Sequence, residues 1–387
     1  MKKYLNKKLK KVFVAMSGGV DSSVAALLLK KQGYDVTGFF MRCYNLDGCA
    51  ERDAEDARRV AGHLGIPFYV WDFEKEYKER VVEYMIRGYA AGLTPNPDVM
   101  CNREIKFGLF LERALNMGAD FVATGHYVKI QSSTIKGQKV HKLFQAKDTN
   151  KDQSYFLWTL TSKDLEHCLF PIGEYVKPEV RKIAKRARLP TAEKKDSQGI
   201  CFLGKITLKD FLKQRLSAKR GAIVTSTGVY VGEHDGAAFY TIGQRHGLKL
   251  GSVNKELGIV KKMETKPYYV AEKNIRKNTL VVAEGEDNPA LYKRTLLLAE
   301  VNWIRSIALG RSLSVRARVR YRQPLAAARI MNKESGIRRG SKGLIHTSSF
   351  LILKFLRPQK FVAPGQSAVF YSNKGEMLGG GIITCGD

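Results

Sequence analysis

The segment Ser17 to Ser22 (SGGVDS) has residue types and spacing suited to binding phosphate. It follows a short apolar run, Val12 to Met16, and precedes apolar residues at helical spacing, so it is predicted to join a strand to a helix. Two glycines let the backbone approach an anion, and the helix directs its free N–H groups at the same point. A tight turn capped by Ser or Asp is the plainer alternative. Asp21 favours the phosphate interpretation, because an acid beside phosphates suits a bridging divalent cation.

A second group lies in the segment TPNPDVMCNR, residues 94 to 103. Its two prolines predict a rigid, extended path, and we expect a helix to begin near Arg103. Asp98 and Cys101 would then lie close to a helix N-terminus. There the helix dipole, Arg103 and Lys106 would lower the pKa of the thiol, as a thiolate nucleophile requires. A buried structural cysteine is the alternative interpretation.

Cys201 stands near the end of a polar segment, residues 189 to 204, that Pro and Gly interrupt. This composition predicts a mobile loop, which suits a group that is carried between sites. The six cysteines are widely spaced and include no C-x-x-C pair. That pattern argues against both a disulfide scaffold and a zinc ribbon.

From residue 11 to about 125 the pattern alternates between strand and helix, which predicts a parallel sheet covered by helices on both faces. After the first strand we expect strands at Val36–Met41, Ile66–Trp71 and Asp120–Thr124, and helices at Glu51–Leu64, Glu74–Ala91 and Arg103–Asn116. Ligands of such sheets bind beyond the carboxyl ends of the strands. The SGGVDS segment, Met41 and Gly125 all fall at strand ends, so they are expected to share one pocket. For Met41, an ordinary core position is the alternative.

The remainder of the chain is predicted to contain mostly short strands. We expect a hairpin (128–131 and 140–146), an aromatic helix (Tyr155–Leu160), a basic helix from Pro178 to about Arg188, and strands near 350–355, 367–371 and 377–384. In Val315–Arg322 four arginines occupy alternate positions, so on a strand they would form one cationic face. The late strands predict a small, closed or nearly closed β-barrel.

The chain is strongly basic. Its 66 Lys and Arg against 37 Asp and Glu give a net charge of +29, with a pI near 9.8. This excess predicts a polyanionic partner, first of all nucleic acid, although a general lysine bias of the source proteome would also produce it. No apolar run reaches the length of a membrane span, and the basic residues 2 to 11 do not lead a signal peptide, so we expect no membrane contact and a cytoplasmic location.

Seven segments in this order make the sequence resemble the bacterial tRNA-specific 2-thiouridylases of the ATP-pyrophosphatase (PP-loop) superfamily. They are AMSGGVDS (15–22), NPDVMCNREIKF (96–107), ATGHY (123–127), KDQSYFL (151–157), KKDSQGICFLG (194–204), YTIGQRHGL (240–248) and APGQ (363–366). The resemblance covers nearly the whole chain. It departs at Gln198, where many relatives have Thr. It implies an N-terminal parallel-sheet α/β catalytic domain (1–206), a small central tRNA-binding domain (207–288) and a C-terminal antiparallel β-barrel (289–387).

The resemblance also implies a reaction. ATP adenylates O2 of the wobble uridine in tRNA and releases pyrophosphate, and a sulfur nucleophile then attacks C2 while AMP departs. A cysteine desulfurase or a sulfur relay protein would supply the sulfur as a persulfide. The uridine O2 is reachable only if the base leaves its stack, which fits a rigid element at the pocket mouth and a basic surface for the anticodon stem.

Residue roles follow from the resemblance by position. ATP, with Mg²⁺ on its phosphates, would be bound by Ala15, Met16, Ser17, Gly18, Gly19, Val20, Asp21, Ser22, Met41 and Gly125. The target base would contact Asn96, Pro97 and Asp98, with Asp98 as general acid/base. Cys201 would receive the persulfide, and Cys101 would attack it or otherwise help to release sulfide onto C2, ending in a Cys101–Cys201 disulfide that a reductant must open. Contacts with tRNA would come from His126, Lys151, Asp152, Gln153, Arg320, Tyr321 and Gln366.

Three rival functions remain open from the sequence. One is another enzyme with the same nucleotide loop, either a different tRNA thiolase or an amidating synthetase, although the Cys101 and Cys201 pair argues against amide formation. A second is a thiolase that uses an iron–sulfur cluster with Cys43 or Cys49 as a third ligand. The third is a non-catalytic RNA-binding protein, which the charge alone would favour.

Overall fold

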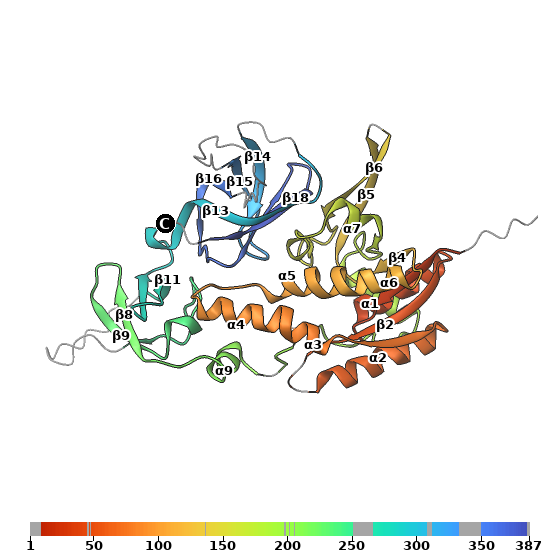
Figure 1. Ribbon diagram of the computed structural model, residues 1–387, viewed down its shortest axis with the longest axis horizontal. Helices are drawn as coiled ribbons and strands as arrows, with labels where there is room; N and C mark the ends of the chain where they lie inside the picture. The colour runs from red at the N-terminus through yellow and green to blue at the C-terminus, as the bar shows by residue number, and fades with distance from the viewer. Residues whose placement is uncertain are drawn as a thin grey trace, which may run out of the picture.

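The structure is a computed structural model. It describes residues 9–44, 46, 48–135, 137–196, 199–200, 202–204, 206–250, 266–307, 312–332 and 350–384, apart from the side chains of residues 49 and 135. Figure 1 shows an α/β region, a small central β region and a barrel, with two long helical rods running beneath the barrel from the first region to the second.

A five-stranded parallel sheet forms the centre of the α/β region, as the alternating pattern predicted. Its strand order is β3-β2-β1-β4-β7, with β1 in the middle. The strands are β1 (Lys11–Ala15), β2 (Asp35–Arg42), β3 (Phe68–Asp72), β4 (Phe121–Ala123) and β7 (Cys168–Leu169). All of them end at the same edge, which is where an open parallel sheet binds its ligands.

Helices cover both faces of this sheet because side chains alternate along its strands. Val12 and Val14 of β1 belong to the apolar core on one face, whereas Phe13 and Ala15 belong to the core on the other. The first face carries α1 (Val20–Lys31), α2 (Cys49–Leu64) and α8 (Lys177–Arg186). The second face carries two rods, 74–90 and 97–116, each with a π-helical part: α3 (Glu74–Tyr77), a π segment (Lys78–Val82) and α4 (Glu83–Ala90), then α5 (Pro97–Cys101), a π segment (Asn102–Phe110) and α6 (Leu111–Asn116).

The predicted hairpin is confirmed as β5 (Val128–Ile135) and β6 (Gln138–Gln145), and α7 (Ser162–Glu166) follows it. The helix predicted at Tyr155–Leu160 is wrong, since only a single 3₁₀ turn forms, at Ser154–Phe156. The aromatic side chains there are drawn toward the barrel instead. The hydroxyl of Tyr155 donates to the carbonyl of Ser367 at 2.9 Å, and Nε1 of Trp158 donates to Oγ of the same serine at 2.9 Å.

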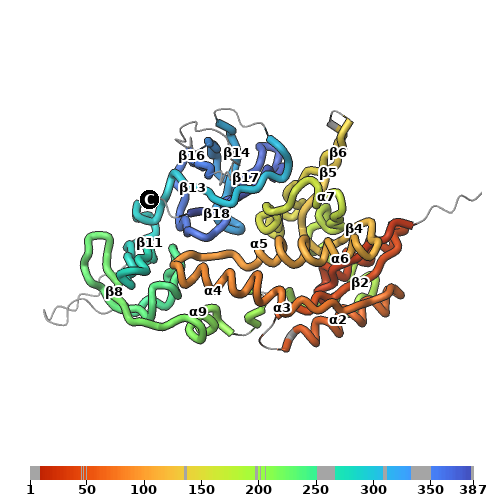
Figure 2. Tube along the Cα trace, in the orientation of Figure 1, coloured from red at the N-terminus to blue at the C-terminus, as the bar shows by residue number. Residues whose placement is uncertain are grey.

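The barrel is closed and antiparallel, as predicted. Its strands are β13 (Tyr292–Trp303), β14 (Leu313–Arg318), β15 (Ala326–Asn332), β16 (Leu351–Lys360), β17 (Ser367–Tyr371) and β18 (Glu376–Ile383). They pair in the order β13-β16-β15-β14-β17-β18, and β13 also pairs with β18. The hairpin extends the same sheet, because Glu376 and Met377 of β18 pair with Phe144 and Leu143 of β6. In Figure 2 the yellow hairpin and the blue barrel both lie above the helical rods.

The central region has a mixed sheet in the order β10-β9-β8-β12-β11. Its strands are β8 (Gly221–Thr225), β9 (Tyr230–His234), β10 (Lys249–Leu250), β11 (Tyr268–Asn274) and β12 (Thr279–Glu284). A short helix that the sequence did not predict, α9 (Leu208–Lys213), precedes this sheet, and 3₁₀ turns lie at Ala237–Phe239 and Pro289–Leu291. Within the described ranges, no helix combines the length and apolarity that a membrane crossing needs.

Candidate active site

The SGGVDS segment forms a preshaped loop between β1 and α1. Gly18 has a φ of +70°, and Gly19 is the N-cap residue of the 12-residue helix α1. The backbone N–H of Ser17 donates to Oγ of Ser22 at 3.1 Å, and the hydroxyl of Ser22 donates to the carbonyl of Gly19 at 3.2 Å. These bonds fix the loop at the first turn of the helix, where backbone N–H groups have no intrahelical partner. The loop therefore has the geometry that a bound phosphate requires.

Gly125 follows β4 and lies directly against this loop. A Cβ atom on Gly125 would come within 2.6 Å of the backbone nitrogen of Ser22, and one on Gly18 within 2.2 Å of the carbonyl oxygen of Asp53 in α2. Neither position has room for a side chain. Met41 is half-buried near the end of β2, at the same edge of the sheet. Gly125 is thus in contact with the loop and Met41 lies one strand away at the same edge of the sheet, while a pocket shared by all three stays a prediction.

Several side chains of the loop region point into the core. Ala15, Met16 and Val20 are at most 6% exposed, so only their backbone groups are placed to meet a nucleotide. Ser23 is also fully buried. Its hydroxyl donates to the carbonyl of Gly19 and accepts from the hydroxyl of Thr191, at 2.8 and 2.9 Å. Ser17 is exposed and therefore remains as a hydroxyl group at the loop surface, whereas the hydroxyl of Ser22 is buried and bonded within the loop.

The carboxylate of Asp21 is held by two side chains that the sequence did not reveal. The hydroxyl of Tyr127 donates to it at 2.8 Å, and Nζ of Lys177 reaches both of its oxygens at 2.9 and 2.8 Å. Burial, reinforced by the Asp21 charge, raises the pKa of the Tyr127 phenol, so it stays a donor. Lys177 is only 8% exposed although it is the first residue of α8. A cation at a helix N-terminus is unfavourable, and this was the one sequence signal that could have singled out Lys177.

Lys177 also joins the loop to the KKDSQG segment. Its Nζ lies 2.7 Å from Oδ1 of Asp196, whose carboxylate is in turn bound by Lys151 at 2.7 Å and by Arg181 at 2.8 Å. Burial alone would raise the pKa of Asp196, but the hydrogen bonds from Lys151 and Lys177 outweigh it and bring the pKa to about 2. Residues far apart in the sequence thus form one charged network beside the SGGVDS loop, residues 17 to 22, which is called the nucleotide loop below.

The Asn96 to Cys101 segment is helical, so the prediction that its helix begins near Arg103 is wrong. Asn96 is the N-cap residue: its Oδ1 accepts from the backbone N–H groups of Asp98 and Val99 at 3.1 and 3.2 Å, and Pro97 occupies the first helical position. Asp98 therefore lies in the first turn, and Cys101, 7% exposed, lies one turn later. The guanidinium of Arg103 pairs with Glu104 and Glu300, at 2.8 and 3.2 Å.

The charge of Lys106 affects the pKa values of both Asp98 and His126. Burial raises the pKa of Asp98, and the charge of Lys106 partly opposes this shift. Burial also holds the pKa of His126 well below its ordinary value, and Lys106 lowers it further. His126 is therefore neutral at pH 7, with Nδ1 2.7 Å from the hydroxyl of Thr124 and its ring 6.0 Å from that of Phe107. Since His126 follows Gly125, this contact connects the nucleotide loop with the helix that carries Asp98.

The side chains of the segment Lys151 to Gln153 form hydrogen bonds and ion pairs within the protein. Asp152 is 2% exposed, and its carboxylate accepts from Gln145, from two backbone N–H groups and from the hydroxyl of Ser154. The side chain of Gln153 accepts from the backbone N–H of Tyr127 at 3.0 Å. Lys151 is about one-third exposed, so of the three it is the best placed to reach an external anion.

The predicted face of four alternating arginines does not form. Strand β14 ends at Arg318, whose buried guanidinium lies 3.5 Å from Asp152 and over the ring of Tyr371, whereas Arg316 is exposed. Beyond the strand end, Arg320 donates to the carbonyl of Ile242 in the central region. The predicted arginine face does not form because β14 ends where the barrel meets the two other regions.

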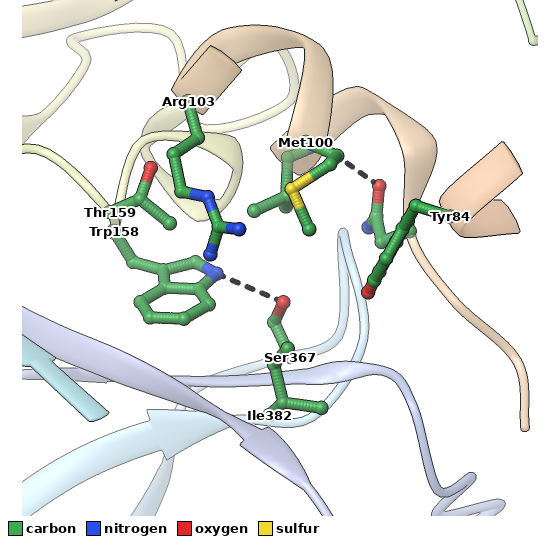
Figure 3. A pocket seen from close by; sticks show the side chains of 9 residues that line it. Tyr84, Met100, Arg103, Trp158, Thr159, Ser367 and Ile382 are labelled. Atoms are coloured by element: carbon green, nitrogen blue, oxygen red, sulfur yellow. Dashed lines mark hydrogen bonds between the residues drawn. The ribbon is translucent and has the colours of Figure 1, made fainter. Parts of the chain in front are cut away.

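Tyr321 and Gln366 likewise lie at contacts between regions. The ring of Tyr321 is 4.5 Å from that of Phe156, and the side-chain amide of Gln366 donates to the carbonyl of Thr94 at 2.7 Å. Figure 3 shows a small cavity at the same junction, where Trp158 and Ser367 are joined by a hydrogen bond. It is lined by Tyr84, Asn96, Val99, Met100, Arg103, Trp158, Thr159, Ser367 and Ile382. The barrel thus packs on the helix that carries Asp98 and Cys101.

Cys201 and Gln198 lie outside the described residues. The residue after Cys201, Phe202, is 1% exposed and its ring packs 5.9 Å from Tyr77 and 5.5 Å from Phe211. No cluster of three or more His, Cys, Asp or Glu side chains able to hold a metal occurs among the described residues, a statement that leaves out Cys201 and the side chain of Cys49.

Comparisons with known proteins show which families this chain resembles. The family model described as tRNA methyl transferase HUP domain matches residues 10–205, the tRNA methyl transferase PRC-barrel domain matches 209–284, and the aminomethyltransferase beta-barrel domain matches 344–383. Curated proteins named tRNA-specific 2-thiouridylase MnmA match over almost their whole length. Those of Nitrosomonas europaea and Bacillus subtilis are each 45% identical over 96% of this chain, covering 98% and 94% of the relative, and that of Christiangramia forsetii is 41% identical over 97% of this chain and 100% of the relative.

This chain belongs to the tRNA-specific 2-thiouridylase family. The resemblance found in the seven sequence segments is confirmed. The family models mention methyl transfer in their descriptions, but the relatives that match across the whole chain are named for thiolation. A solved 4-thiouridine synthetase–RNA complex with bound ATP aligns with 53% of this chain and 50% of its own at a TM-score of 0.32 and 15% identity, which is too distant to support an argument.

Proposed function

We propose that this protein is a tRNA-uridine 2-sulfurtransferase that uses ATP to replace O2 of a wobble uridine with sulfur. The extended identity to 2-thiouridylases supports the activity. The structural observation that supports it best is the contact of Gly125 with the SGGVDS loop together with that of its neighbour His126 with Phe107, which follows Asp98 on the same helical rod. These contacts would put the proposed phosphate site near a partly buried carboxyl group whose pKa burial raises, which suits adenylation of a pyrimidine oxygen.

In the first step O2 of the uridine attacks the α-phosphorus of ATP, an O–P bond forms, and the bond to pyrophosphate breaks. The backbone of residues 15 to 22, with Met41 and Gly125, would bind the nucleotide. Asn96 and Pro97 would hold the flipped base, and Asp98 would exchange a proton with the pyrimidine ring. The raised pKa of Asp98 suits this role, because such a carboxyl group carries a proton at higher pH than an ordinary aspartate.

In the second step sulfur attacks C2, and the C2–O bond breaks as AMP leaves with the oxygen. The persulfide on Cys201, delivered by a cysteine desulfurase or a relay protein, would supply this sulfur. Attack of the Cys101 thiolate on the Cys201 sulfur would break the S–S bond and release sulfide toward C2. The resulting disulfide retains two oxidising equivalents, so a dithiol or two thiols must reduce it before the next turnover.

We propose that Mg²⁺ enters with the ATP phosphates. Both oxygens of Asp21 already accept hydrogen bonds from Lys177, so its carboxylate does not fit a resident cation in this arrangement. Asp21 would reach a phosphate-bound cation only if Lys177 gave up at least one of these bonds. The cation would neutralise charge on the phosphates.

For tRNA we propose Lys151, Arg320, Tyr321, Gln366 and His126 as the group of residues around the bound anticodon. Asp152 and Gln153 would act by fixing the segment that carries Lys151, in keeping with their internal hydrogen bonds. The net charge of +29 suits the approach of a polyanion. We also propose the division into a catalytic domain (1–206), a central tRNA-binding domain (207–288) and a barrel domain (289–387), and action in the cytoplasm, where tRNA is modified.

Nucleoside mass spectrometry of tRNA from cells that lack the gene tests this function. We expect 2-thiouridine to be absent and to return with the wild-type gene, but not with Cys101→Ser or Cys201→Ser. Unchanged thiolation in the deletion strain would contradict the proposal.

The same assay separates persulfide chemistry from an iron–sulfur cluster. Under the persulfide mechanism Cys43→Ser and Cys49→Ser serve as matched controls and retain 2-thiouridine. Loss of thiolation in either, together with iron in anaerobically purified protein, would favour the cluster-dependent thiolase instead.

A further inference from the structure

Lys177 is placed where it could respond to the nucleotide. Its side chain is 10% exposed, and Nζ contacts Asp21 of the nucleotide loop and Asp196 of the KKDSQG segment at the same time. A buried ammonium is stable only while it is paired, so the loss of one carboxylate must be compensated by another anion. The group next to Asp21 that could supply such an anion is the phosphate chain of a nucleotide on the loop.

Three sets of contacts hold the segment Thr191 to Asp196 against the SGGVDS loop and the helices beside it. Thr191 donates to Ser23 of α1 at 2.9 Å, and Lys194 pairs with Asp53 and Asp56 of α2 at 2.7 and 2.6 Å. The carbonyl of Asp53 is the atom that contacts Gly18. The third set is the pair between Asp196 and Lys177. The segment therefore contacts both helices that border the loop. Its connection to Asp21 is through the ammonium group of Lys177, which binds Asp196 and Asp21.

Two of the three carboxylates in this cluster pair with its cations. Asp21 and Asp196 bind the side chains of Lys177, Lys151 and Arg181, whereas the carboxylate of Asp148 accepts from backbone N–H groups, including those of Lys151 and Lys177. The strong depression of the Asp196 pKa shows that its carboxylate stays ionised and holds these cations. When Asp21 turns to a cation on the phosphates, Asp196 can keep the ammonium of Lys177 beside them.

We propose that Lys177 is a positioning residue that couples occupancy of the nucleotide site to the segment Thr191–Asp196: on ATP binding its ammonium moves from Asp21 to the phosphates while it remains bound to Asp196. This inference rests on the proposed function, because it requires ATP on the SGGVDS loop. Cys201 is five residues beyond Asp196 in the sequence, so the coupling would act on the chain that leads to the sulfur-bearing cysteine. Activation of the base and delivery of sulfur would then share one electrostatic contact.

Two measurements on the full-length protein test the coupling. Calorimetry measures ATP·Mg²⁺ affinity without tRNA, and hydrogen–deuterium exchange compares peptides covering Thr191–Asp196 with and without saturating ATP. For the wild type we expect binding and ATP-dependent protection of the segment. Lys177→Met should weaken binding by about tenfold or more and abolish the protection, and Lys177→Arg should restore most of both, since a charged partner worth about 1.4 kcal/mol changes affinity tenfold.

Lys185→Met is the matched control. Lys185 lies on the same helix and pairs with Glu193 of the same segment at 2.9 Å, but it does not contact Asp21. We expect its affinity to stay within about twofold of the wild type, with protection retained. Asp196→Asn provides a second variant: it should bind ATP, because Lys177 can still move from Asp21 to the phosphates, yet show no protection of the segment.

The outcomes separate the two proposals. A wild-type protein that binds no ATP would contradict the proposed function and the coupling together. Wild-type binding with no protection of Thr191–Asp196, or protection that persists in Lys177→Met at saturating ATP, would overturn the coupling alone. Thermal unfolding of each variant, which we expect to remain cooperative, confirms that a loss does not come from misfolding; if Lys177→Met fails to fold, Lys177→Arg and Asp196→Asn decide.

Discussion

The nucleotide loop and the helix that begins at Pro97 are held in place by different kinds of interaction. Around the loop, side chains from distant segments form ion pairs, with Lys177 at their centre. The helix depends on backbone capping by Asn96, on burial of Cys101, and on contacts with the barrel. Ion pairs can be exchanged for the charges of a ligand, whereas caps and packing cannot. Under the proposed function, the difference predicts that the phosphate end of the site rearranges and that its base end stays fixed.

The strongest test of this contrast is to fill the space between the loop and Gly125. Gly125→Ala would place a methyl group 2.6 Å from the nitrogen of Ser22, where only the backbone could yield. We expect ATP affinity to fall by about 100-fold or more, because small displacements of a phosphate site are costly. Calorimetry with ATP measures this. Gly62→Ala in α2, where no atom lies within 4 Å, is the control and should bind ATP normally; equal affinity in both variants would mean that the loop tolerates displacement.

The buried pair between Arg318 and Asp152 tests how firmly the barrel is bound to the segment Lys151–Gln153. Arg318→Met leaves the Asp152 carboxylate buried without its cation, so we expect a loss of about 3 kcal/mol in the free energy of unfolding. Urea denaturation measures the loss. Arg316→Met on the same strand removes an exposed arginine and should change stability by less than about 0.5 kcal/mol. Similar values for the two variants would show that the pair contributes little.

A pH experiment addresses the histidines. Burial lowers the pKa values of His126, His141 and His234, so the folded protein binds fewer protons there than the unfolded chain does. Stability should therefore be intact above the unfolded pKa of about 6.5 and should decline as the pH falls below it, by at most about 1.4 kcal/mol per pH unit for each histidine. Denaturation curves at pH 7.5 and 5.5 measure this. His126→Gln should show a shallower decline, and an identical slope would contradict the assignment.

The smallest expected effect is at the helix cap. Asn96→Ala removes the acceptor for the N–H groups of Asp98 and Val99, and should cost about 1 kcal/mol of stability. Asn96→Asp keeps an acceptor at this position and is the control. Thermal unfolding compares the two variants. If Asn96→Ala were as stable as Asn96→Asp, the cap would not be what fixes the start of the helix.

The sequence was sufficient for features that depend on local patterns. Alternation of strands and helices predicted the parallel sheet, and the strands expected near 350–355, 367–371 and 377–384 predicted the barrel. The helix begins at Pro97 rather than near Arg103, because Asn96 and Pro97 form an N-cap and N1 pair, whereas two prolines one residue apart predict an extended path. That error came from turn chemistry that was visible in the sequence.

Other features could not be predicted because they depend on long-range contacts. The pairs of Asp21 with Tyr127 and Lys177 span 106 and 156 residues, and no local pattern signals them. The helix expected at Tyr155 is absent because side chains there bond to Ser367 of the barrel, more than 200 residues away. The four-arginine face failed for the same reason, since Arg318 turns to Asp152. Local secondary-structure propensity is overridden where a distant part of the chain supplies a buried hydrogen-bond or ion-pair partner.

Strand β18 pairs on one edge with β13 and, near its start, with β6 of the hairpin that follows β4. A single hydrogen-bonded sheet therefore joins the hairpin β5–β6, which follows β4 of the parallel sheet, to the barrel in the last third of the chain. Under the proposed function, extruding a nucleotide from a stacked anticodon would load both sides of the enzyme, and this shared sheet would resist their separation. The hairpin and the barrel should accordingly move as one unit, leaving the central region as the part that can adjust to the tRNA.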